Sequence, residues 1–453
     1  MLTQTADPLY QCELGDGLIL RWSTTADTEN IAYLASSVFR NAPDAPVNTF
    51  LANMLYEMMA GQHPVMGPGD VAVVEDRRRQ EHPLVACTCL WRQTWEYAGI
   101  PFEIGRPEIV ATDPDYRNRG LVRAIFGLIH ARSEAEGHLA QGITGIPYFY
   151  RQFGYEYALD LDVSRITHCA LIPPAKEGVP EACSLRDASL GDLPLITSLY
   201  ERQRADYPVS THIDEQWWRY QIQTWNTMEA DAHWHIFIIL AADGAPVGYL
   251  TLPTIRWRQS IPVFDLAVCA GVNLQAIMPA LLRAIQVQGV NLLTPPKAEP
   301  INKIAFSLGQ KHPAYAVLGR ELAFERDIPY AWYVRVPNLL KFLRHIAPAL
   351  ERRVEHSALS GYSGELVLSF YRDGLRLVFD KGHLNSAEDW RPPTWNSNEH
   401  AAFPPLVFLQ LLFGRRSLHD LRYAFPDVRV NNGAELLLET LFPTSPAWVV
   451  PLG

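Results

Sequence analysis

The sequence lacks several features that would place it in a special class of protein. No apolar run reaches the ~18 residues that a membrane-spanning helix requires. The opening residues, MLTQTADPLY, contain neither the basic nor the apolar stretch of a secretion signal. The six cysteines include no CxxC pair, so the sequence predicts neither a zinc site nor a disulfide framework. We therefore expect a cytoplasmic protein without a membrane span.

An excess of positive charge is also absent. The chain has 49 acidic and 39 basic residues, which give a formal net charge of -10. Nucleic-acid-binding proteins usually show the opposite balance, so we predict no nucleic-acid partner, and a cationic substrate is mildly favoured. His233 and His235 share one face of a predicted strand, but no third ligand accompanies them, so we predict no metal site.

The chain is long enough to form several hydrophobic cores. At ~150 residues per domain, the 453 residues suggest about three domains. The stretch 173–180, which is rich in proline and contains a glycine, is the clearest linker. We place the predicted domains at residues 1–163, 164–327 and 328–453.

The most informative stretch runs from residue 104 to residue 137. Its β-branched part, 109–112, reads as the end of a strand, and Asp113-Pro114-Asp115 breaks that strand. A helical spacing of apolar residues begins after Gly120. A strand that ends in a basic, glycine-containing turn before a helix leaves several backbone N–H groups unpaired and directed at one point. This pattern indicates an anion-binding site.

The same stretch resembles the acetyl-CoA signature of the GNAT acyltransferases, Arg/Gln-x-x-Gly-x-Gly/Ala. Arg117 and Gly120 match the first two defined positions, and Val122 replaces the small third residue. The segment GIPYFYRQFGY at 145–155 resembles the second marker of the family, Tyr-x-x-x-Gly-Tyr/Phe, and this reading selects Tyr150 rather than its neighbours Tyr148 and Tyr155. The resemblance implies that acetyl-CoA is held by Val110, Ala111, Thr112, Arg117, Asn118, Arg119, Gly120, Leu121 and Val122.

The predicted order of elements supports this resemblance. Residues 18–137 read as β-α-α-β-β-β-α, which is the order of the GNAT fold. Residues 184–288 repeat the order, but their last strand–helix junction, VCAGVNL at 268–274, has no Arg-x-x-Gly pattern. We therefore expect no second acetyl-CoA there. After residue 328 we predict a strand, a helix over 337–354, a hairpin formed by 366–371 and 375–379, a loop over 389–399, and helices over 406–413 and 417–424.

Two GNAT-like halves followed by such a third part resemble the enhanced intracellular survival (Eis) family of acetyltransferases. The resemblance implies an α+β fold class: tandem GNAT-like domains with mixed sheets flanked by helices, then a sterol-carrier-like α/β domain. It also implies a homo-oligomer, a hexamer, and a small-molecule or lysine amine as the acceptor.

The resemblance further implies direct attack of the amine on acetyl-CoA in a ternary complex. Tyr150 would be the general acid, and the carboxylate of Gly453, the last residue, would be the base. A Glu or Asp that acts through water is the alternative base, with Glu103 and Glu108 as candidates. The rival hypothesis is a GNAT scaffold that binds CoA or a lipid without turnover.

Overall fold

The computed structural model describes residues 5–40, 42, 44–161, 164–226, 233–294, 299–391 and 399–451. Within these ranges the protein is α+β, and its strands form a ten-stranded sheet, two four-stranded sheets and a five-stranded sheet. None of the helices in these ranges is long and apolar enough to cross a membrane.

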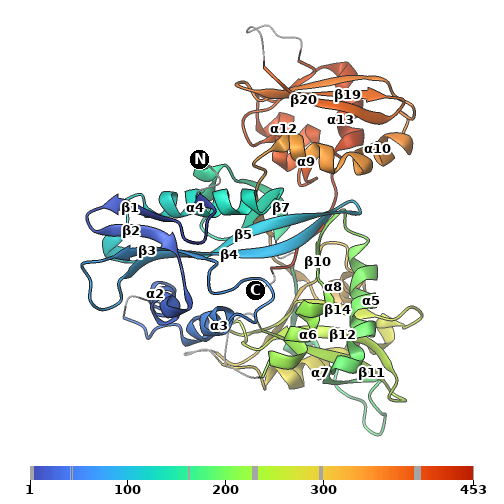
Figure 1. The fold of residues 1–453 in the computed structure, drawn as a ribbon. Helices are drawn as coiled ribbons and strands as arrows, with labels where there is room; N and C mark the ends of the chain where they lie inside the picture. Colours follow the sequence, from blue (N-terminus) through green and yellow to red (C-terminus); the bar gives the residue numbers. More distant parts are fainter. Residues whose placement is uncertain are drawn as a thin grey trace.

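The ten-stranded sheet is the centre of the N-terminal region (Figure 1). Its main path runs β1-β2-β3-β4-β5-β6-β17-β7, and β10 and β23 extend it beside β4. The strands are β1 (Gln11–Gly15), β2 (Leu18–Trp22), β3 (Val71–Asp76), β4 (Leu84–Tyr97), β5 (Ile100–Thr112), β6 (Ala140–Ile143), β7 (Glu156–Leu161), β10 (Val209–His212), β17 (Tyr330–Arg335) and β23 (Ala447–Trp448).

Helices cover both faces of this sheet. Helix α4 (Leu121–Ala135) packs its apolar side chains on β2, β3 and β4. Helices α2 (Thr28–Val38) and α3 (Thr49–Met59) pack on the other face. The predicted order β-α-α-β-β-β-α is confirmed for β2 to α4, and β1 before it was not predicted.

The second region contains both four-stranded sheets, with the orders β14-β12-β11-β9 and β13-β15-β8-β16. The strands are β8 (Ser164–His168), β9 (Cys183–Asp187), β11 (Trp234–Ala241), β12 (Pro246–Pro253), β13 (Ser260–Val263), β14 (Asp265–Val268), β15 (Lys303–Ser307) and β16 (Glu325–Arg326), and the helices are α5 (Leu193–Arg204), α6 (Glu215–Thr224), α7 (Leu274–Gly289) and α8 (Ala314–Leu322). The strand that precedes the junction at 268–274 is part of a longer run that breaks at Phe264 into β13 and β14, which belong to different sheets.

The C-terminal region has the five-stranded sheet β20-β19-β18-β21-β22 with helices packed against it. Its elements are α9 (Leu339–His345), α10 (Ala347–Glu355), β18 (Gly364–Ser369), β19 (Gly374–Asp380), β20 (His383–Trp390), β21 (Ala401–Ala402), α11 (Phe408–Leu412), α12 (Leu418–Ala424), β22 (Arg429–Val430) and α13 (Asn432–Leu441). The predicted hairpin is confirmed. The predicted helix over 337–354 is two helices, and Pro348 in the first turn of the second has no N–H to continue the first. The predicted loop was wrong at its start, because β20 extends to Trp390, and 392–398 lie outside the described ranges.

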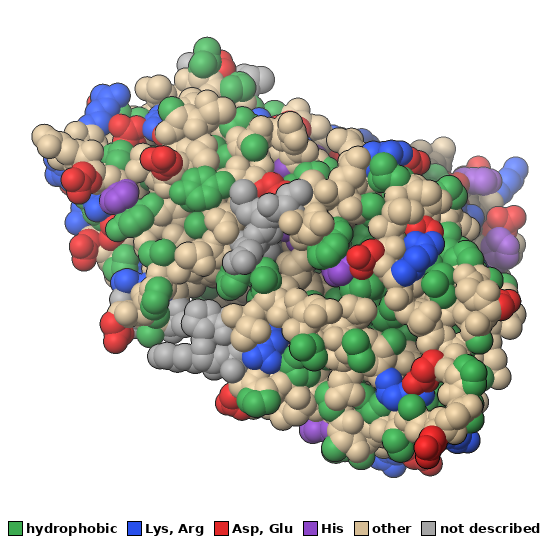
Figure 2. Space-filling view, turned by 90° about the horizontal axis from the view of Figure 1, so that it is seen from below, with side chains coloured by type: hydrophobic (Ala, Val, Ile, Leu, Met, Phe, Trp, Pro, Cys, Tyr) green, Lys and Arg blue, Asp and Glu red, His purple; other side chains and the backbone are tan. Residues whose placement is uncertain are grey.

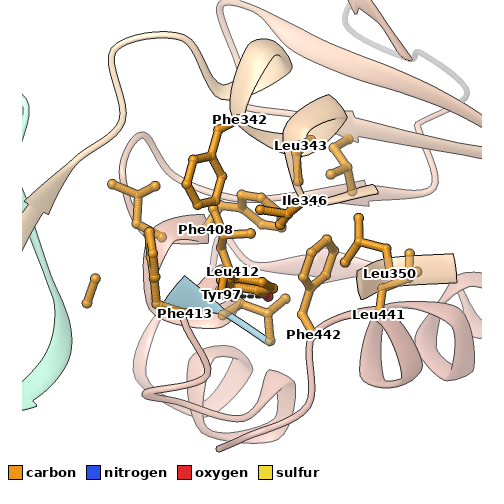
Figure 3. Packing of buried hydrophobic residues seen from close by; sticks show 14 of the residues in the cluster. Tyr97, Phe342, Leu343, Ile346, Leu350, Phe408, Leu412, Phe413, Leu441 and Phe442 are labelled. Carbon is orange, nitrogen blue, oxygen red and sulfur yellow. Dashed lines mark hydrogen bonds between the residues drawn. The ribbon is translucent and has the colours of Figure 1, made fainter. Parts of the chain in front are cut away.

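Strand β17 and the β4–β5 hairpin both join the C-terminal region to the central sheet. Strand β17, which precedes α9, pairs antiparallel with both β6 and β7, although the predicted boundary at 327/328 groups it with the C-terminal region. At the tip of the β4–β5 hairpin, Tyr97 enters the core of that region, and its hydroxyl donates to the Leu412 carbonyl over 2.7 Å (Figure 3). Phe342 and Phe413 pack edge-on against the Tyr97 ring.

The surface mixes charges of both signs. On the face drawn in Figure 2, acidic and basic side chains alternate with hydrophobic ones, and neither charge gathers into one continuous patch.

Candidate active site

The site begins where β5 separates from β6. Strand β5 pairs with β4 along its length, but its parallel pairing with β6 is confined to Ile104 with Ala140 and Gly105 with Gln141. Beyond Gly105 the two strands diverge, so this edge of β5 has no partner strand within the described parts of the chain. Its N–H and C=O groups are therefore available to a ligand with amide groups of its own.

A bulge shifts the register of β5 just beyond the point of divergence. Cys87 pairs with Ala111 and Cys89 pairs with Glu108, so Ile109 and Val110 together face a single residue of β4. Ile109 has a left-handed φ of 54°, which is strained for a β-branched residue. The bulge directs the two residues to opposite faces: Ile109 packs against the α2/α3 core, and Val110 packs against an aromatic cluster near α4.

The predicted phosphate loop leads into the N-terminus of α4. Asn118 and Gly120 are both left-handed, with φ of 62° and 77°. No side chain caps the helix, and Ala124 is the first residue to bond back, to Gly120 O over 3.1 Å. The N–H groups of 121–123 therefore lack intrahelical partners. A Cβ built on Gly120 meets no protein atom within 4 Å, so the space beside the Gly120 Cα is open.

The arginines Arg119 and Arg123 flank this helix end, and the acidic Asp113 and Asp115 precede it in the turn. Arg119 lies over the Tyr116 ring at 4.7 Å and donates to the Asp115 carbonyl over 3.2 Å. Arg123 donates to Gln152 over 3.0 Å. The guanidinium groups and the helix dipole favour the same ligand, an anion such as a pyrophosphate.

The predicted residues converge only in part. Tyr150 begins the short helix η3 (Tyr150–Phe153) and belongs to a buried aromatic cluster with Phe126 and Tyr333, against which Val110 and Val122 also pack. Ala111 instead packs into the α2/α3 core, and Leu121, the first residue of α4, packs against β2, β3 and β4. The Thr112 hydroxyl is buried and has no hydrogen-bond partner among the described residues. For these three residues only the backbone can face the same site.

Tyr150 is held as a protonated phenol. Burial raises its pKa, and the negative charge of Glu108 and the nearby Tyr330 hydroxyl raise it further. The neighbouring tyrosines fit the acid role less well. The Tyr155 hydroxyl is 2.8 Å from His130 Nε2 and its side chain is fully buried, whereas the Tyr148 side chain is 69% exposed.

The carboxylates considered as bases differ in position. Glu108 is bonded to Arg106, whose guanidinium lies between the Trp91 and Trp332 rings at 5.2 and 4.8 Å. Burial raises the pKa of Glu108, and Arg106 opposes the shift. Glu103 is exposed and accepts from the Thr94 hydroxyl over 2.9 Å at the far end of β5.

Gly453 lies outside the described residues, and its role as a base stays a prediction. The chain before it returns to the central sheet. β23 pairs with β10, and the Val450 N–H donates to Thr211 Oγ1 over 2.9 Å. Val450 is buried in the same large core as Ala111.

At the equivalent strand–helix junction of the second region, between β14 and α7, side chains of the protein already bond the backbone groups. Asn273 caps α7 by accepting from the Ala276 N–H over 3.1 Å. Arg202 donates to the Val268 carbonyl, and His312 Nε2 is 2.7 Å from the Leu266 carbonyl. The carbonyls at this edge of β14 are thus already bonded within the protein. His233 and His235, in the same region, bond to different carboxylates, Glu57 and Asp187.

Sequence reasoning missed the contribution of β17 to the site. Tyr330 and Tyr333 of this strand and Tyr157 of β7 surround the loop before Tyr150. The signal was present as a tyrosine-rich predicted strand at 329–336, but its local pattern does not show which sheet it joins.

The match to a known family agrees with this geometry. Residues 20–158 match the family model of the acetyltransferase (GNAT) domain. The chain is therefore an acyltransferase enzyme of a fold that uses an acyl-CoA such as acetyl-CoA and takes amine acceptors. No curated protein matches the chain in sequence.

Solved structures share the fold over nearly the whole chain. A protein of Enterococcus faecalis V583, described as a probable N-acyltransferase, is 14% identical with a TM-score of 0.67, over 96% of this chain and 99% of that one. A GCN5-related N-acetyltransferase from Anabaena variabilis is 13% identical with a TM-score of 0.64, over 95% and 99%. Eis1 from Mycobacterium abscessus is 14% identical with a TM-score of 0.57, over 95% and 99%. At these identities the likeness shows the fold alone.

Proposed function

We propose that the protein is an N-acetyltransferase that transfers the acetyl group of acetyl-CoA to a primary amine by direct attack in a ternary complex. The observation that supports this most strongly is that three features of the proposed mechanism meet at one place. The free end of α4, the diverging edge of β5 and the Tyr150 phenol all border the aromatic cluster around Phe126.

The backbone of residues 117–122 would hold the pyrophosphate of the cofactor. The uncapped N–H groups at the start of α4 supply donors, and the left-handed Gly120 leaves room for the phosphate oxygens. Val110 and Thr112, on the open edge of β5, would bond the amide groups of the pantetheine arm. Their N–H groups would also polarise the thioester carbonyl.

Tyr150 would give its proton to the departing thiolate. A raised pKa keeps the phenol protonated at neutral pH, so a proton is available when negative charge develops on the sulfur. The hydroxyl is not consumed by a structural hydrogen bond within the part of the chain that is described. This distinguishes it from the hydroxyl of Tyr155.

Glu108 is our candidate for the base, and the terminal carboxylate of Gly453 is the second candidate. Glu108 is near enough to Tyr150 for its charge to raise the pKa of that phenol. Its own pKa is raised by burial, which favours acceptance of a proton from an ammonium acceptor.

We also propose an Eis-like organisation. The near-complete coverage by Eis1 from Mycobacterium abscessus and the two sets of GNAT-like elements favour tandem GNAT-like domains at 1–163 and 164–327. The five-stranded sheet with packed helices after 328 favours a sterol-carrier-like domain. The hexamer and the cytoplasmic location stay predictions.

The test is the release of free CoA from acetyl-CoA with a panel of polyamine, aminoglycoside, amino acid and lysine-peptide acceptors. Tyr150→Phe should lower kcat by about 100-fold and change the KM for acetyl-CoA little, because the phenol acts in the transition state. Acetyl-CoA binding without turnover on any acceptor would instead favour the CoA- or lipid-binding protein.

A version extended by a few residues beyond Gly453 separates the two bases. If the terminal carboxylate takes the proton, the extension should abolish turnover. If Glu108 does so, the extended protein should keep its rate.

A further inference from the structure

Three tyrosines surround the loop that leads to Tyr150. Tyr157 is on β7, and Tyr330 and Tyr333 are on β17, 173 and 176 residues further along the chain. The Tyr157 hydroxyl is 2.6 Å from the Tyr333 hydroxyl and 3.3 Å from the Tyr330 hydroxyl. The Tyr157 and Tyr333 rings stack with centroids 4.1 Å apart. The three phenols therefore form one connected group.

This group binds the backbone of the loop at three positions, residues 145, 146 and 148. The Tyr330 hydroxyl donates to the Gly145 carbonyl. The Tyr333 hydroxyl is 3.1 Å from the Ile146 carbonyl, and the Tyr148 N–H donates to the Tyr157 oxygen over 3.0 Å. Tyr330 and Tyr333 use their protons on the Gly145 and Ile146 carbonyls, so the single Tyr157 proton can serve only one of its two tyrosine neighbours. The shorter distance favours Tyr333 as its acceptor.

The loop is strained and largely exposed. Gly145 and Tyr148 have φ of 106° and 60°, and a left-handed non-glycine residue such as Tyr148 costs about 1 kcal/mol or more. The Ile146 and Tyr148 side chains are 51% and 69% exposed, so burial contributes little. Strain of this kind persists only where surrounding contacts fix the conformation, and the hydroxyls supply those contacts.

The loop continues directly into the proposed proton donor. Phe149 N–H bonds to the Ile146 carbonyl over 3.3 Å, and Tyr150 follows as the first residue of η3. The Tyr333 ring packs edge-on against the Tyr150 ring with centroids 5.4 Å apart. The same group that holds the loop thus also touches the donor ring.

We propose that Tyr157, Tyr330 and Tyr333 are positioning residues for Tyr150, and that β17 thereby completes the active site from the C-terminal part of the chain. This proposal rests on the proposed role of Tyr150 as the proton donor. The hydroxyls act on the loop backbone and the donor ring, and none of them transfers a proton to the substrate.

The test removes the hydroxyls and keeps the rings. Tyr330→Phe combined with Tyr333→Phe should lower kcat by about tenfold, since misplacing a catalytic group by a fraction of an ångström costs this much. The KM for acetyl-CoA should not change. Tyr315→Phe is the matched control: it removes a buried hydroxyl that bonds the Phe306 carbonyl over 3.0 Å in the second region, and it should change the melting temperature but not kcat.

A double-mutant cycle decides between positioning and general damage. In a Tyr150→Phe background the two extra substitutions should cause no further loss, because the donor that they position is already absent. An equal loss in both backgrounds, or no loss in either, would overturn the proposal. If Tyr150→Phe alone keeps the full rate, the proposed function of Tyr150 fails instead.

Hydrogen exchange gives a readout independent of turnover. In the double variant the backbone amides of 145–149 should exchange faster than in the wild-type protein, while those of α4 keep their protection. Unchanged exchange in the loop would show that the hydroxyls do not hold it, and would also overturn the proposal.

Discussion

The clearest test of the cofactor loop is Gly120→Ala, because the substitution should affect binding far more than folding. Gly120 has a left-handed φ of 77°, and an added methyl group meets no protein atom within 4 Å. The cost in folding free energy is therefore the backbone cost alone, about 1–2 kcal/mol. The methyl group would enter the open space beside the start of α4, next to the proposed phosphate site.

The expected loss of affinity follows from the free N–H groups at the start of α4. A hydrogen bond to a charged group contributes about 1.5–3 kcal/mol, so the loss of one bond should weaken acetyl-CoA binding by about tenfold to a hundredfold. Isothermal titration of acetyl-CoA against the full-length protein measures this directly.

The chain supplies a matched control at the other end of the same helix. Gly137 follows the C-terminus of α4, has a φ of 91°, and also meets nothing within 4 Å when a Cβ is added. Gly137→Ala should lower the melting temperature as much as Gly120→Ala and leave acetyl-CoA binding unchanged. If Gly120→Ala binds acetyl-CoA as tightly as the wild-type protein, or if both variants lose affinity equally, the loop is not the phosphate site.

Two further outcomes follow from buried carboxylates. Glu108→Gln keeps an oxygen for Arg106 but cannot take a proton, so kcat should fall by about 100-fold. In the wild-type protein the rate should drop as pH falls through the raised pKa of Glu108. An unchanged rate in the variant would favour the Gly453 carboxylate as the base. Burial raises the pKa of Asp265 from its ordinary value of 3.8 to about 6, so its ionisation opposes folding. Up to about 3 kcal/mol of stability should therefore be lost as pH rises through this interval. Asp265→Asn cannot ionise, so its deficit in melting temperature relative to the wild-type protein should shrink between pH 4 and pH 7; a deficit independent of pH would contradict the shift.

The sequence alone was sufficient to predict those parts of the candidate site that depend on residues adjacent in the chain. A β-branched strand end, a proline break and the glycine before a helix are local signals, and the structure has β5, the turn and α4 in that order. Tyr150 was selected by its spacing from Gly154 and Tyr155, and the structure buries it beside Val110 and Val122.

The parts that were missed depend on distant residues. Local propensity and alternation predict that β17 is a strand, but they do not encode that its partners are β6 and β7. The hydrogen bonds of Arg202 and His312 to carbonyls of β14 likewise require side chains from two separate segments to meet this strand. Only the missing Arg-x-x-Gly pattern at 268–274 was visible beforehand.

The place of β17 in the central sheet has a consequence for how the protein is made. Among the described residues, β17 is the strand with which β7 pairs, and Tyr157 and Tyr330 are 173 residues apart in the chain. At a synthesis rate of about 5–20 residues per second, the partner strand emerges from the ribosome roughly 10–35 s after β7. During that interval the β17-facing edge of β7 in a nascent chain has no partner, so the part of the sheet beside the Tyr150 loop is completed only late in translation.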